Sequence, residues 1–284
     1  MTTLQTISAI RQERARLGKV ALVPTMGALH EGHLSLIRKA KELATHVIVS
    51  IFVNPTQFGP REDFSKYPRP IEEDSRKCEA AGVDLIFNPS EHEMYRPNLP
   101  SIIVDLPQLS EVLEGKHRPG HFRGVCQVVA KLFNIIQPQV ACFGQKDYQQ
   151  LRIISAMAEA LDWPIEIAAC PTVREKDGLA MSSRNQYLSA DERERALVIS
   201  RALMLAEGEV KTGEKRANKL VALMQNMLLD PGKLGRVPLS IEYVAAIDPM
   251  TLKPVDNLTG PTVLAIAARV GSTRLIDNVT VEPK

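Results

Sequence analysis

A short apolar run meets a turn with two glycines and two histidines in Val20-Ala-Leu-Val-Pro-Thr-Met-Gly-Ala-Leu-His-Glu-Gly-His33. Residues 20–23 are typical of a buried strand, and the apolar positions that begin at Leu34 are typical of an amphipathic helix. Residues 25–33 are therefore predicted to form the turn between a strand and a helix start. His30 and His33 lie three positions apart in this turn.

The turn has the features of an anion site. Backbone N–H groups at a helix N-terminus lack intrahelical acceptors and attract negative charge. Gly27 and Gly32 let the backbone approach a ligand closely, and His30 and His33 add directed hydrogen-bond donors. This combination favours a site for nucleotide phosphates. The spacing alone leaves two alternatives open, a surface loop with incidental histidines and one half of a zinc site.

Composition places the chain among globular proteins of one large or two ordinary domains. It has 284 residues, of which 44% are hydrophobic and 24% are charged. The 35 Lys and Arg residues nearly balance the 33 Asp and Glu residues, and the net charge of +2 gives no reason to expect a nucleic-acid partner. Any selectivity for anions must therefore be local.

Cysteine usage and hydropathy point to a cytoplasmic enzyme. The four cysteines form no Cys-x-x-Cys pair and follow no secretory leader, which argues against structural zinc and a disulfide framework. We expect buried, unreactive thiols at Cys142 and Cys170, which lie in apolar strand-like runs. No apolar run approaches the ~20 residues that a membrane-spanning helix needs.

The first part of the chain alternates strand-like and helix-like runs. Strands separated by helices predict an α/β fold, a Rossmann-like parallel sheet with helices on both faces. Ligands of such sheets bind beyond the carboxyl ends of the strands, where the chain order reverses. The predicted strands are 20–24, 47–53, 84–88, 140–143 and 165–170, and the predicted helices are 33–44, 70–81, 124–136 and 148–161.

The pattern changes after about residue 175 and predicts a smaller C-terminal α+β domain with an antiparallel sheet. We place the boundary near Thr172, which gives domains 1–172 and 173–284. The predicted helices are 189–205 and 215–229, and after Pro231-Gly232 the predicted strands are 240–247, 262–270 and 275–279.

Two further segments offer donors for phosphate, although the chain has neither a P-loop nor a Gly-x-Gly-x-x-Gly motif. Met181-Ser-Ser-Arg-Asn185 follows the charged run Arg174-Glu-Lys-Asp-Gly178 and could bind a triphosphate, or it could be a helix cap beside solvated charges. In Gly144-x-Lys146-Asp147 the lysine could neutralise phosphate charge while the aspartate accepts from a ribose hydroxyl, or the two could form a surface ion pair.

Five motifs occur in order over nearly the whole chain. They are Thr25-Met-Gly-Ala-Leu-His30-Glu-Gly-His33, Phe52-Val-Asn54-Pro-Thr-Gln57-Phe58, Arg118-Pro-Gly-His121-Phe-Arg-Gly-Val125, Phe143-Gly-Gln-Lys146-Asp147-Tyr-Gln-Gln150 and Asp177-Gly-Leu-Ala-Met-Ser182-Ser183-Arg184-Asn-Gln-Tyr187-Leu188. Together they resemble the pantothenate synthetases (pantoate–β-alanine ligases) of the HIGH-motif nucleotidyltransferase superfamily. Gln145 stands where many members of this family carry an acidic residue.

The resemblance implies an ATP-dependent ligation in two steps. The carboxylate of (R)-pantoate would attack the α-phosphorus of ATP to give pantoyl adenylate and pyrophosphate. The amine of β-alanine would then attack the acyl carbon and release AMP, with pantothenate as the product. The alternative is an adenylyltransferase of the same superfamily that stops at nucleotide transfer, and a non-enzymatic alternative is a zinc or nucleotide-binding module.

The resemblance also implies residue roles. His30, His33 and Lys146 would stabilise the transition state. Asn54, Gln57 and Gln150 would bind pantoate or β-alanine, since an amide adds no charge that repels an acid. The residues implied for ATP are Met26, Gly27, His30, Gly32, His33, Gly144, Lys146, Asp147, Val173, Met181, Ser182, Ser183 and Arg184.

Family members use Mg²⁺ with ATP and are dimers, so the resemblance implies both here. Asp74 is a candidate Mg²⁺ ligand, although its helical pattern predicts a solvated side chain. The comparison places residues 117–121 near the active-site entrance, while His121 and Arg123 individually are expected to be structural. The side chain of Met26 is expected to pack. The second domain is expected to cover the ATP site and to act as a hinged lid.

Overall fold

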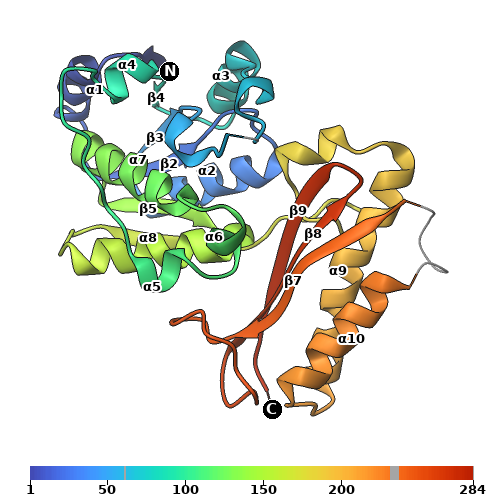
Figure 1. Cartoon of the computed structure of the whole chain (residues 1–284). Coiled ribbons are helices and arrows are strands. Elements are labelled where there is room, and N and C mark those ends of the chain that lie inside the picture. Colours follow the sequence, from blue (N-terminus) through green and yellow to red (C-terminus); the bar gives the residue numbers. More distant parts are fainter. Residues whose placement is uncertain (61, 231–236, 284) are drawn as a thin grey trace. The chain divides into compact units, whose positions relative to one another are not determined.

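The computed structural model describes residues 1–60, 62–230 and 237–283, and it divides into two compact units (Figure 1). The first unit is Met1–Glu111, Arg118–Gln145 and Gln150–Pro171. The second unit is Val112–His117, Lys146–Gln149 and Thr172–Lys284. A single boundary near Thr172 therefore does not describe this division completely, because two short segments that precede Thr172 belong to the second unit.

The first unit is built on a six-stranded sheet with the order β1-β4-β3-β2-β5-β6, whose pairings are parallel. The predicted α/β fold is confirmed, and each predicted strand is present with its ends shifted by at most two residues. The strands are β1 (Thr2–Leu4), β2 (Val20–Thr25), β3 (His46–Ile51), β4 (Leu85–Phe87), β5 (Val140–Gly144) and β6 (Glu166–Cys170).

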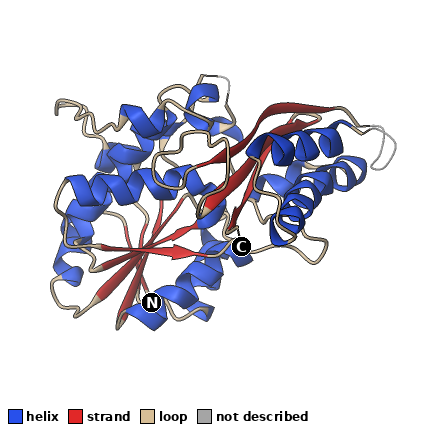
Figure 2. Ribbon diagram, turned by 90° about the horizontal axis from the view of Figure 1, so that it is seen from below, coloured by secondary structure: helices blue, strands red, loops and turns tan. Residues whose placement is uncertain are grey.

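Helices cover both faces of this sheet (Figure 2). Cys142 of β5 packs in a cluster with Leu36 and Ile37 of α2, whereas the neighbouring Phe143 has its ring 6.4 Å from that of Phe133 in α7. Adjacent residues of a strand point to opposite faces, so α2 and α7 lie on opposite sides. The helices of this unit are α1 (Ile7–Arg14), α2 (Glu31–Leu43), α3 (Ile71–Ala80), α4 (Glu91–Met94), α5 (Pro107–Ser110), α7 (His121–Ile136) and α8 (Tyr148–Ala160).

The strand order fixes where a ligand site can lie. From β2 the chain continues to β3 on one side, whereas β5 pairs with the other edge of β2. The order of the chain therefore reverses between β2 and β5, which is the position where open parallel sheets leave a crevice. The turn 25–33 follows β2 and Gly144 ends β5, so both lie at this position.

The buried carboxylate of Asp74 holds the turn after β2. Its two oxygens accept from the backbone N–H groups of Ala28, at 2.8 Å, and Leu29, at 2.7 Å. Gly27 and Ala28 both have positive φ, 82° and 50°, so this part of the turn has a backbone conformation that needs such support. Lys77, one helical turn further along α3, donates to the Leu29 carbonyl at 2.6 Å.

The prediction that Asp74 is solvated is wrong, because its side chain lies on the inner face of α3 with none of its surface exposed. Burial raises the pKa of Asp74 above its ordinary value, although the N–H groups of Leu29 and Ala28 act in the opposite direction. Both carboxylate oxygens already accept backbone hydrogen bonds. Asp74 is therefore a structural anchor and a poor candidate for a Mg²⁺ ligand.

The second unit contains a three-stranded antiparallel sheet in the order β7-β8-β9, which confirms the predicted C-terminal sheet. Two helices pack on this sheet and share one apolar core with it. The predicted turn Pro231-Gly232 lies outside the described residues. The elements are α6 (Glu114–His117), α9 (Ala190–Lys211), α10 (Ala217–Leu229), β7 (Leu239–Ile247), β8 (Thr262–Val270) and β9 (Thr273–Val281).

The four cysteines are buried and unpaired, as expected for core thiols. Burial raises the pKa of Cys78 and of Cys126 to about 12, so these thiols stay protonated at neutral pH. Among the described residues, the helices are too short or too polar to cross a membrane.

A close approach of α7 to the 3₁₀ turn η1 (Pro55–Gln57) requires glycine at position 124. A Cβ atom on Gly124 would lie 2.3 Å from the carbonyl oxygen of Thr56 and 2.6 Å from the backbone nitrogen of Gln57. The side-chain amide of Asn54 donates to the Gly124 carbonyl at 3.1 Å and joins the two segments. The segment that follows β3 is thus packed tightly against α7.

We predict that Gly124→Ala destabilises the fold by roughly 1–3 kcal/mol, the usual cost of overpacking, because backbone must move to admit the methyl group. Urea unfolding monitored by circular dichroism measures this loss. Gly208→Ala is the matched control, since Gly208 lies in α9 and, apart from its own stretch of helix backbone, no atom lies within 4 Å of the position of a Cβ. Equal midpoints for wild type and Gly124→Ala would contradict the tight contact.

We predict that Asp74→Asn lowers the free energy of unfolding by about 1–3 kcal/mol, because one oxygen becomes an NH₂ group that faces a backbone N–H. Urea unfolding again gives the measurement. Glu72→Gln is the control, since Glu72 is an exposed acidic residue of the same helix, two positions before Asp74. A loss in the control as large as that in Asp74→Asn would mean that general charge, and not the anchored turn, causes the effect.

Candidate functional site

His30 and His33 form a reciprocal cap at the N-terminus of α2. The Nδ1 atom of His30 accepts from the backbone N–H of Gly32 at 3.1 Å, and Nδ1 of His33 accepts from the backbone N–H of His30 at 3.3 Å. The two ring centroids lie 4.1 Å apart. Both rings are therefore fixed by the same turn of backbone that the sequence singles out.

The cap also fixes the tautomer of each ring. A nitrogen that accepts a hydrogen bond carries no hydrogen, so in the neutral form of each imidazole the hydrogen sits on Nε2. His30 and His33 thus direct one N–H donor each from the start of a 13-residue helix, whose N-terminus carries partial positive charge. Donors and dipole together suit an oxyanion and fit the phosphate interpretation better than the zinc interpretation.

Beyond the end of β3, the residues from Asn54 to Gln57 form a second polar cluster at the same edge of the sheet. Asn54 is buried, and its amide donates to Gln57 Oε1 at 3.0 Å. Its Oδ1 atom accepts from the hydroxyl of Tyr95 at 2.7 Å and from that of Thr56 at 3.0 Å. Asn54 is therefore held within the protein, and its amide fixes the Oε1 atom of Gln57.

The side-chain nitrogen of Gln57 connects this cluster to the histidine turn. Its Nε2 atom donates to the sulfur of Met26 at 3.3 Å. A thioether is a weak acceptor, so a ligand oxygen can replace it at little cost. The prediction for the Met26 side chain is packing, and the sulfur contact with Gln57 adds a second role for this side chain that its residue type does not signal.

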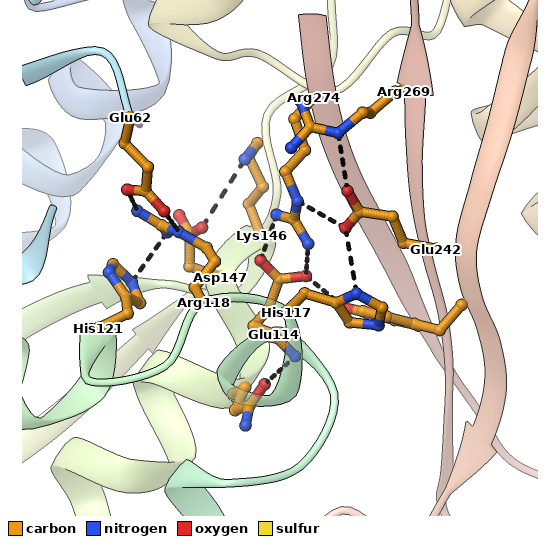
Figure 3. Close-up of polar contacts among 12 residues, drawn as sticks. Glu62, Glu114, His117, Arg118, His121, Lys146, Asp147, Glu242, Arg269 and Arg274 are labelled. Atoms are coloured by element: carbon orange, nitrogen blue, oxygen red, sulfur yellow. Dashed lines mark hydrogen bonds and ion pairs between the residues drawn. The ribbon is translucent and has the colours of Figure 1, made fainter. Parts of the chain in front are cut away.

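A chain of charged and polar groups continues from the Gln57 carbonyl to His121, the first residue of α7, and on to Arg118 and Glu62. Figure 3 shows the last three residues of this chain. His121 bonds the carbonyl oxygen of Gln57 through Nδ1 at 2.8 Å and Arg118 through Nε2 at 3.0 Å. A carbonyl only accepts and a guanidinium only donates, so His121 is neutral with its hydrogen on Nδ1. The expected structural role of His121 agrees with these contacts, and the equally structural Arg123 pairs with Asp105 at 3.2 Å.

Glu62 completes this chain by a bidentate contact with Arg118, at 2.8 and 2.6 Å. Burial raises the pKa of the Glu62 carboxyl, but the hydrogen bond and charge of Arg118 outweigh it, and the pKa lies below its ordinary value. The pair is therefore ionised at neutral pH. It ties the segment after η1 to the start of α7.

Gly144 and Gln150 belong to the first unit as well. Gly144 is the last residue of β5, and Gln150 lies in the first turns of α8, where its side chain is half-buried. The structure thus collects seven predicted residues after β2 and β3, and Gly144 ends the strand beside β2. The seven residues are Met26, Gly27, His30, Gly32, His33, Asn54 and Gln57.

The other predicted ATP residues belong to the second unit. The backbone N–H of Met181 donates to the Val173 carbonyl at 3.0 Å and closes a small hairpin. Ser182 then caps the 3₁₀ helix η4 (Ser183–Tyr187), with its hydroxyl accepting from the N–H of Arg184 at 3.2 Å. The helix-cap interpretation of Ser182 is therefore confirmed. The cap holds the backbone of Ser183 and Arg184 in the first turn of η4.

Lys146 and Asp147 also lie in the second unit. Lys146 Nζ is 3.8 Å from Asp147 Oδ1, and the Lys146 side chain is largely buried while that of Asp147 is half-exposed. The ion pair that the sequence left open is therefore present. The Lys146 carbonyl accepts from the side-chain amide of Asn278 at 2.8 Å.

Sequence reasoning missed the polar residues of β9 and the carboxylate of Glu114 in α6. Arg274 forms a bidentate ion pair with the buried Glu114, and the hydroxyl of Tyr243 donates to the same carboxylate at 2.8 Å (Figure 3). Burial raises the pKa of Tyr243 well above its ordinary value, with the Glu114 charge acting in the same direction. The available signal was two adjacent polar residues, Asp277 and Asn278, within the predicted strand 275–279, with Arg274 directly before it.

No cluster of three or more His, Cys, Asp or Glu side chains within residues 1–60, 62–230 and 237–283 is arranged to hold a metal ion. The described residues offer instead backbone N–H groups, imidazoles, amides, hydroxyls and cations. Such groups bind phosphate and carboxylate oxygens.

Comparison with known proteins agrees with this chemistry. The model of the Pantoate-beta-alanine ligase family matches residues 1–280. The pantothenate synthetase of Moorella thermoacetica is 51% identical over 286 residues, which cover 99% of each chain. That of Acetivibrio thermocellus is 49% identical over 281 residues, which cover 99% of this chain and 98% of the relative.

Solved structures show the same similarity. The pantothenate synthetase of Thermus thermophilus is 41% identical and covers 100% of both chains with a TM-score of 0.92. The pantoate-β-alanine ligase of Francisella tularensis, solved as a complex with β-γ ATP and β-alanine, is 33% identical and covers 98% of this chain and 97% of its own with a TM-score of 0.78. Since the match extends over both units, the chain belongs to the pantoate-β-alanine ligase family.

Proposed function

We propose that this protein is an ATP-dependent ligase that condenses (R)-pantoate with β-alanine to form pantothenate. The observation that carries this proposal is the family match over residues 1–280, which includes the second unit as well as the nucleotide-binding fold. The geometry of the histidine cap supports it, because two oriented N–H donors at a helix N-terminus are what a transferring phosphate group needs.

In the first step a carboxylate oxygen of pantoate forms a bond to the α-phosphorus of ATP. The bond from that phosphorus to the leaving pyrophosphate breaks, and pantoyl adenylate remains. Negative charge shifts onto the pyrophosphate during this step, so charge stabilisation is the main task of the site. We assign this task to the Nε2 donors of His30 and His33 and to the ammonium group of Lys146.

In the second step the amine of β-alanine attacks the acyl carbon, a C–N bond forms, and AMP leaves with the former carboxylate oxygen. The amine loses a proton in this step. The chemistry needs no covalent bond to the protein. The protein accelerates this step by holding the adenylate and the amine in position for attack.

We assign the remaining ATP contacts to residues of both units. Ser182, Ser183 and Arg184 offer two hydroxyls and a guanidinium for the phosphate chain. Asp147 and the Gly144 backbone are assigned to the ribose. Further contacts are assigned to Met26, Gly27, Gly32, Val173 and Met181.

Pantoate is assigned to Gln57 and Gln150, whose amides offer donor and acceptor without charge. The weak bond of Gln57 to the Met26 sulfur supports this assignment, because a hydroxyl or carboxylate oxygen is a stronger acceptor. Asn54 is assigned to the same subsite. Its bonds to Gln57, Tyr95 and Gly124 favour a role in orienting Gln57.

Mg²⁺ is proposed to arrive bound to ATP. This ion keeps several waters and binds proteins mostly through substrate phosphates, with few side-chain ligands. It would offset the charge of the leaving pyrophosphate. Location in the cytoplasm and closure of the second unit over ATP stay predictions.

An assay for AMP with ATP, pantoate and β-alanine tests the function. We expect AMP to form only when all three substrates are present. Without β-alanine, pyrophosphate release should stop at about one equivalent per enzyme, because the adenylate stays bound. Continued pyrophosphate release without β-alanine would instead indicate the adenylyltransferase alternative, and stoichiometric zinc in the purified chain would contradict the phosphate role of the histidines.

The segment after α4 supports a homodimer. Leu99, Ile102 and Ile103 are 61%, 72% and 67% exposed, which is unusual for three large apolar side chains within five residues. Residues 101–106 form no regular secondary structure within the chain, and Ile102-Ile103-Val104 are β-branched residues that favour strand pairing. We propose that a second copy of the chain covers this segment.

We predict that His33→Gln lowers the rate of pantoyl adenylate formation by roughly 10²- to 10³-fold with little change in the KM for ATP, because the lost donor acts mainly in the transition state. Glutamine at this position can still accept from the N–H of His30, so the helix cap and the stability should persist. Stopped-flow or quenched-flow measurement of pyrophosphate release gives the rate. His92→Ala, an exposed change on α4, is the control. An unchanged rate in His33→Gln would refute the role of His33.

We predict that the double variant Ile102→Glu, Ile103→Glu is monomeric, because buried carboxylates repel across a two-fold contact. Sedimentation velocity of wild type and variant measures the mass. Met250→Glu is the control, since Met250 is similarly exposed and lies in the second unit. A variant with the same dimeric mass as the wild type would place the contact elsewhere.

A further inference from the structure

Two neighbouring polar residues lie buried in β9, where the strand pattern predicts only structure. Asp277 is 4% exposed and Asn278 is 8% exposed. The register of β9 with β8 is regular, with Asp277 opposite Ile266 and Asn278 opposite Ala265. Leu275 belongs to the core beneath α9 and α10, so Asp277 shares the helix-covered face and Asn278 lies on the other face.

Asp277 holds the hairpin that precedes Ser182. Its carboxylate accepts from both terminal nitrogens of Arg174, at 2.6 and 3.0 Å. The same guanidinium donates to the Gly178 carbonyl at 3.2 Å, and Arg174 pairs with Ala180 in an isolated bridge. A bidentate contact of an arginine with a buried carboxylate fixes position as well as distance. The start of the segment Ser182–Arg184 is thereby tied to β9.

Asn278 holds the second segment. Its side-chain amide donates to the backbone carbonyl of Lys146 at 2.8 Å. Its backbone N–H donates to Asp277 Oδ1 at 2.8 Å, so the carboxylate that binds Arg174 also fixes the residue that binds Lys146. One pair of adjacent residues therefore reaches two chain segments that lie far apart in the sequence.

A third contact of β9 secures the same segment from its far end. Arg274, on the face of Asn278, pairs with Glu114, whose backbone N–H donates to Gln149 Oε1 at 2.9 Å (Figure 3). Gln149 in turn donates to the Val112 carbonyl at 2.8 Å. The segment Lys146–Gln149 is thus held at its first residue by Asn278 and at its last residue through Glu114.

We propose that Asp277 and Asn278 are positioning residues for ATP, which place Lys146 and the segment Ser182–Arg184 in register with each other. This inference rests on the proposed function, which assigns both segments to the nucleotide. Neither Asp277 nor Asn278 contacts the substrate in this proposal. Asn278 acts on the reaction through the backbone of Lys146, and Asp277 acts through Arg174.

Asn278→Ala and the volume-keeping Asn278→Leu remove the bond to Lys146. We expect each variant to lower kcat/KM for ATP in adenylate formation about tenfold, the effect of one lost hydrogen bond, while the KM for pantoate stays unchanged. Asp277→Asn keeps the shape of the side chain but weakens its bond to Arg174. This variant should also lower kcat/KM for ATP, through a higher KM for ATP. Thr280→Ala, an exposed change on the same strand, is the control.

A double-mutant cycle separates positioning from general stability. If Asn278 acts through Lys146, then Asn278→Ala should lower the rate less than about twofold in a Lys146→Ala background. Thermal unfolding of each variant shows which of them are folded, and only folded variants are compared. Independent losses that multiply in the double variant, or a parallel rise in the KM for pantoate, would overturn the proposal.

The same experiments distinguish this inference from the proposed function. If wild type forms no AMP from ATP, pantoate and β-alanine, the proposed function fails. If wild type is active and the folded Asn278 and Asp277 variants match it in kcat/KM for ATP, only the positioning proposal fails.

Discussion

The predicted chemistry of the first unit depends on the hydrogen bonds that the buried carboxylate of Asp74 accepts from the turn after β2. This carboxylate accepts from two consecutive backbone N–H groups in a turn whose residues at 27 and 28 have positive φ. Without an acceptor, these buried N–H groups would cost free energy, and the chain would leave this conformation. Because the turn leads directly into the N-cap of α2, the same contact fixes where the helix begins. The directions of the His30 and His33 rings follow from it.

In the second unit, strand β9 holds the segments that the proposed function assigns to the nucleotide. A nucleotide's phosphate chain needs cations and hydroxyls from separate segments, and long side chains such as lysine and arginine lose much entropy when they are held in place. Asp277 binds the Arg174 guanidinium in the hairpin before Ser182, and Asn278 binds the backbone carbonyl of Lys146. Under the positioning proposal, these contacts leave mainly the Lys146 and Arg184 side chains to be ordered by the nucleotide. A buried pair on one strand is a stiffer support than a loop, because its own position is set by the ladder with β8.

Alternation of apolar runs was sufficient to predict both sheets and most helices, because strands such as β2 and β3 are buried on both faces and read as continuous apolar runs. The strand β1 and the helix α1 escaped prediction for a physical reason. Thr2 and Thr3 lie at the exposed edge of the sheet, and α1 has only Ile10 buried, so neither has an apolar period to detect. The histidine cap was predictable from local sequence, since its partners lie within three residues. Asp74, Asn278 and Glu114 were not, because their partners lie 45, 132 and 160 residues away.

The polar chain through α7 shows why long-range contacts matter for the candidate pantoate subsite. Arg118 donates to Glu62 on one side and to His121 on the other, and His121 donates to the backbone carbonyl of Gln57, which is thereby held firmly. The Nε2 atom of Gln57, in contrast, donates to a thioether, the weakest acceptor within the group. Ordinary hydrogen bonds thus hold the backbone and the Oε1 atom of Gln57, and only its Nε2 donor has a weak partner that a substrate oxygen would replace under the proposed function. If the Nε2 donor of Gln57 were bonded to a strong acceptor instead, that bond would have to be lost on substrate binding, and the affinity for the substrate would fall by the cost of that loss.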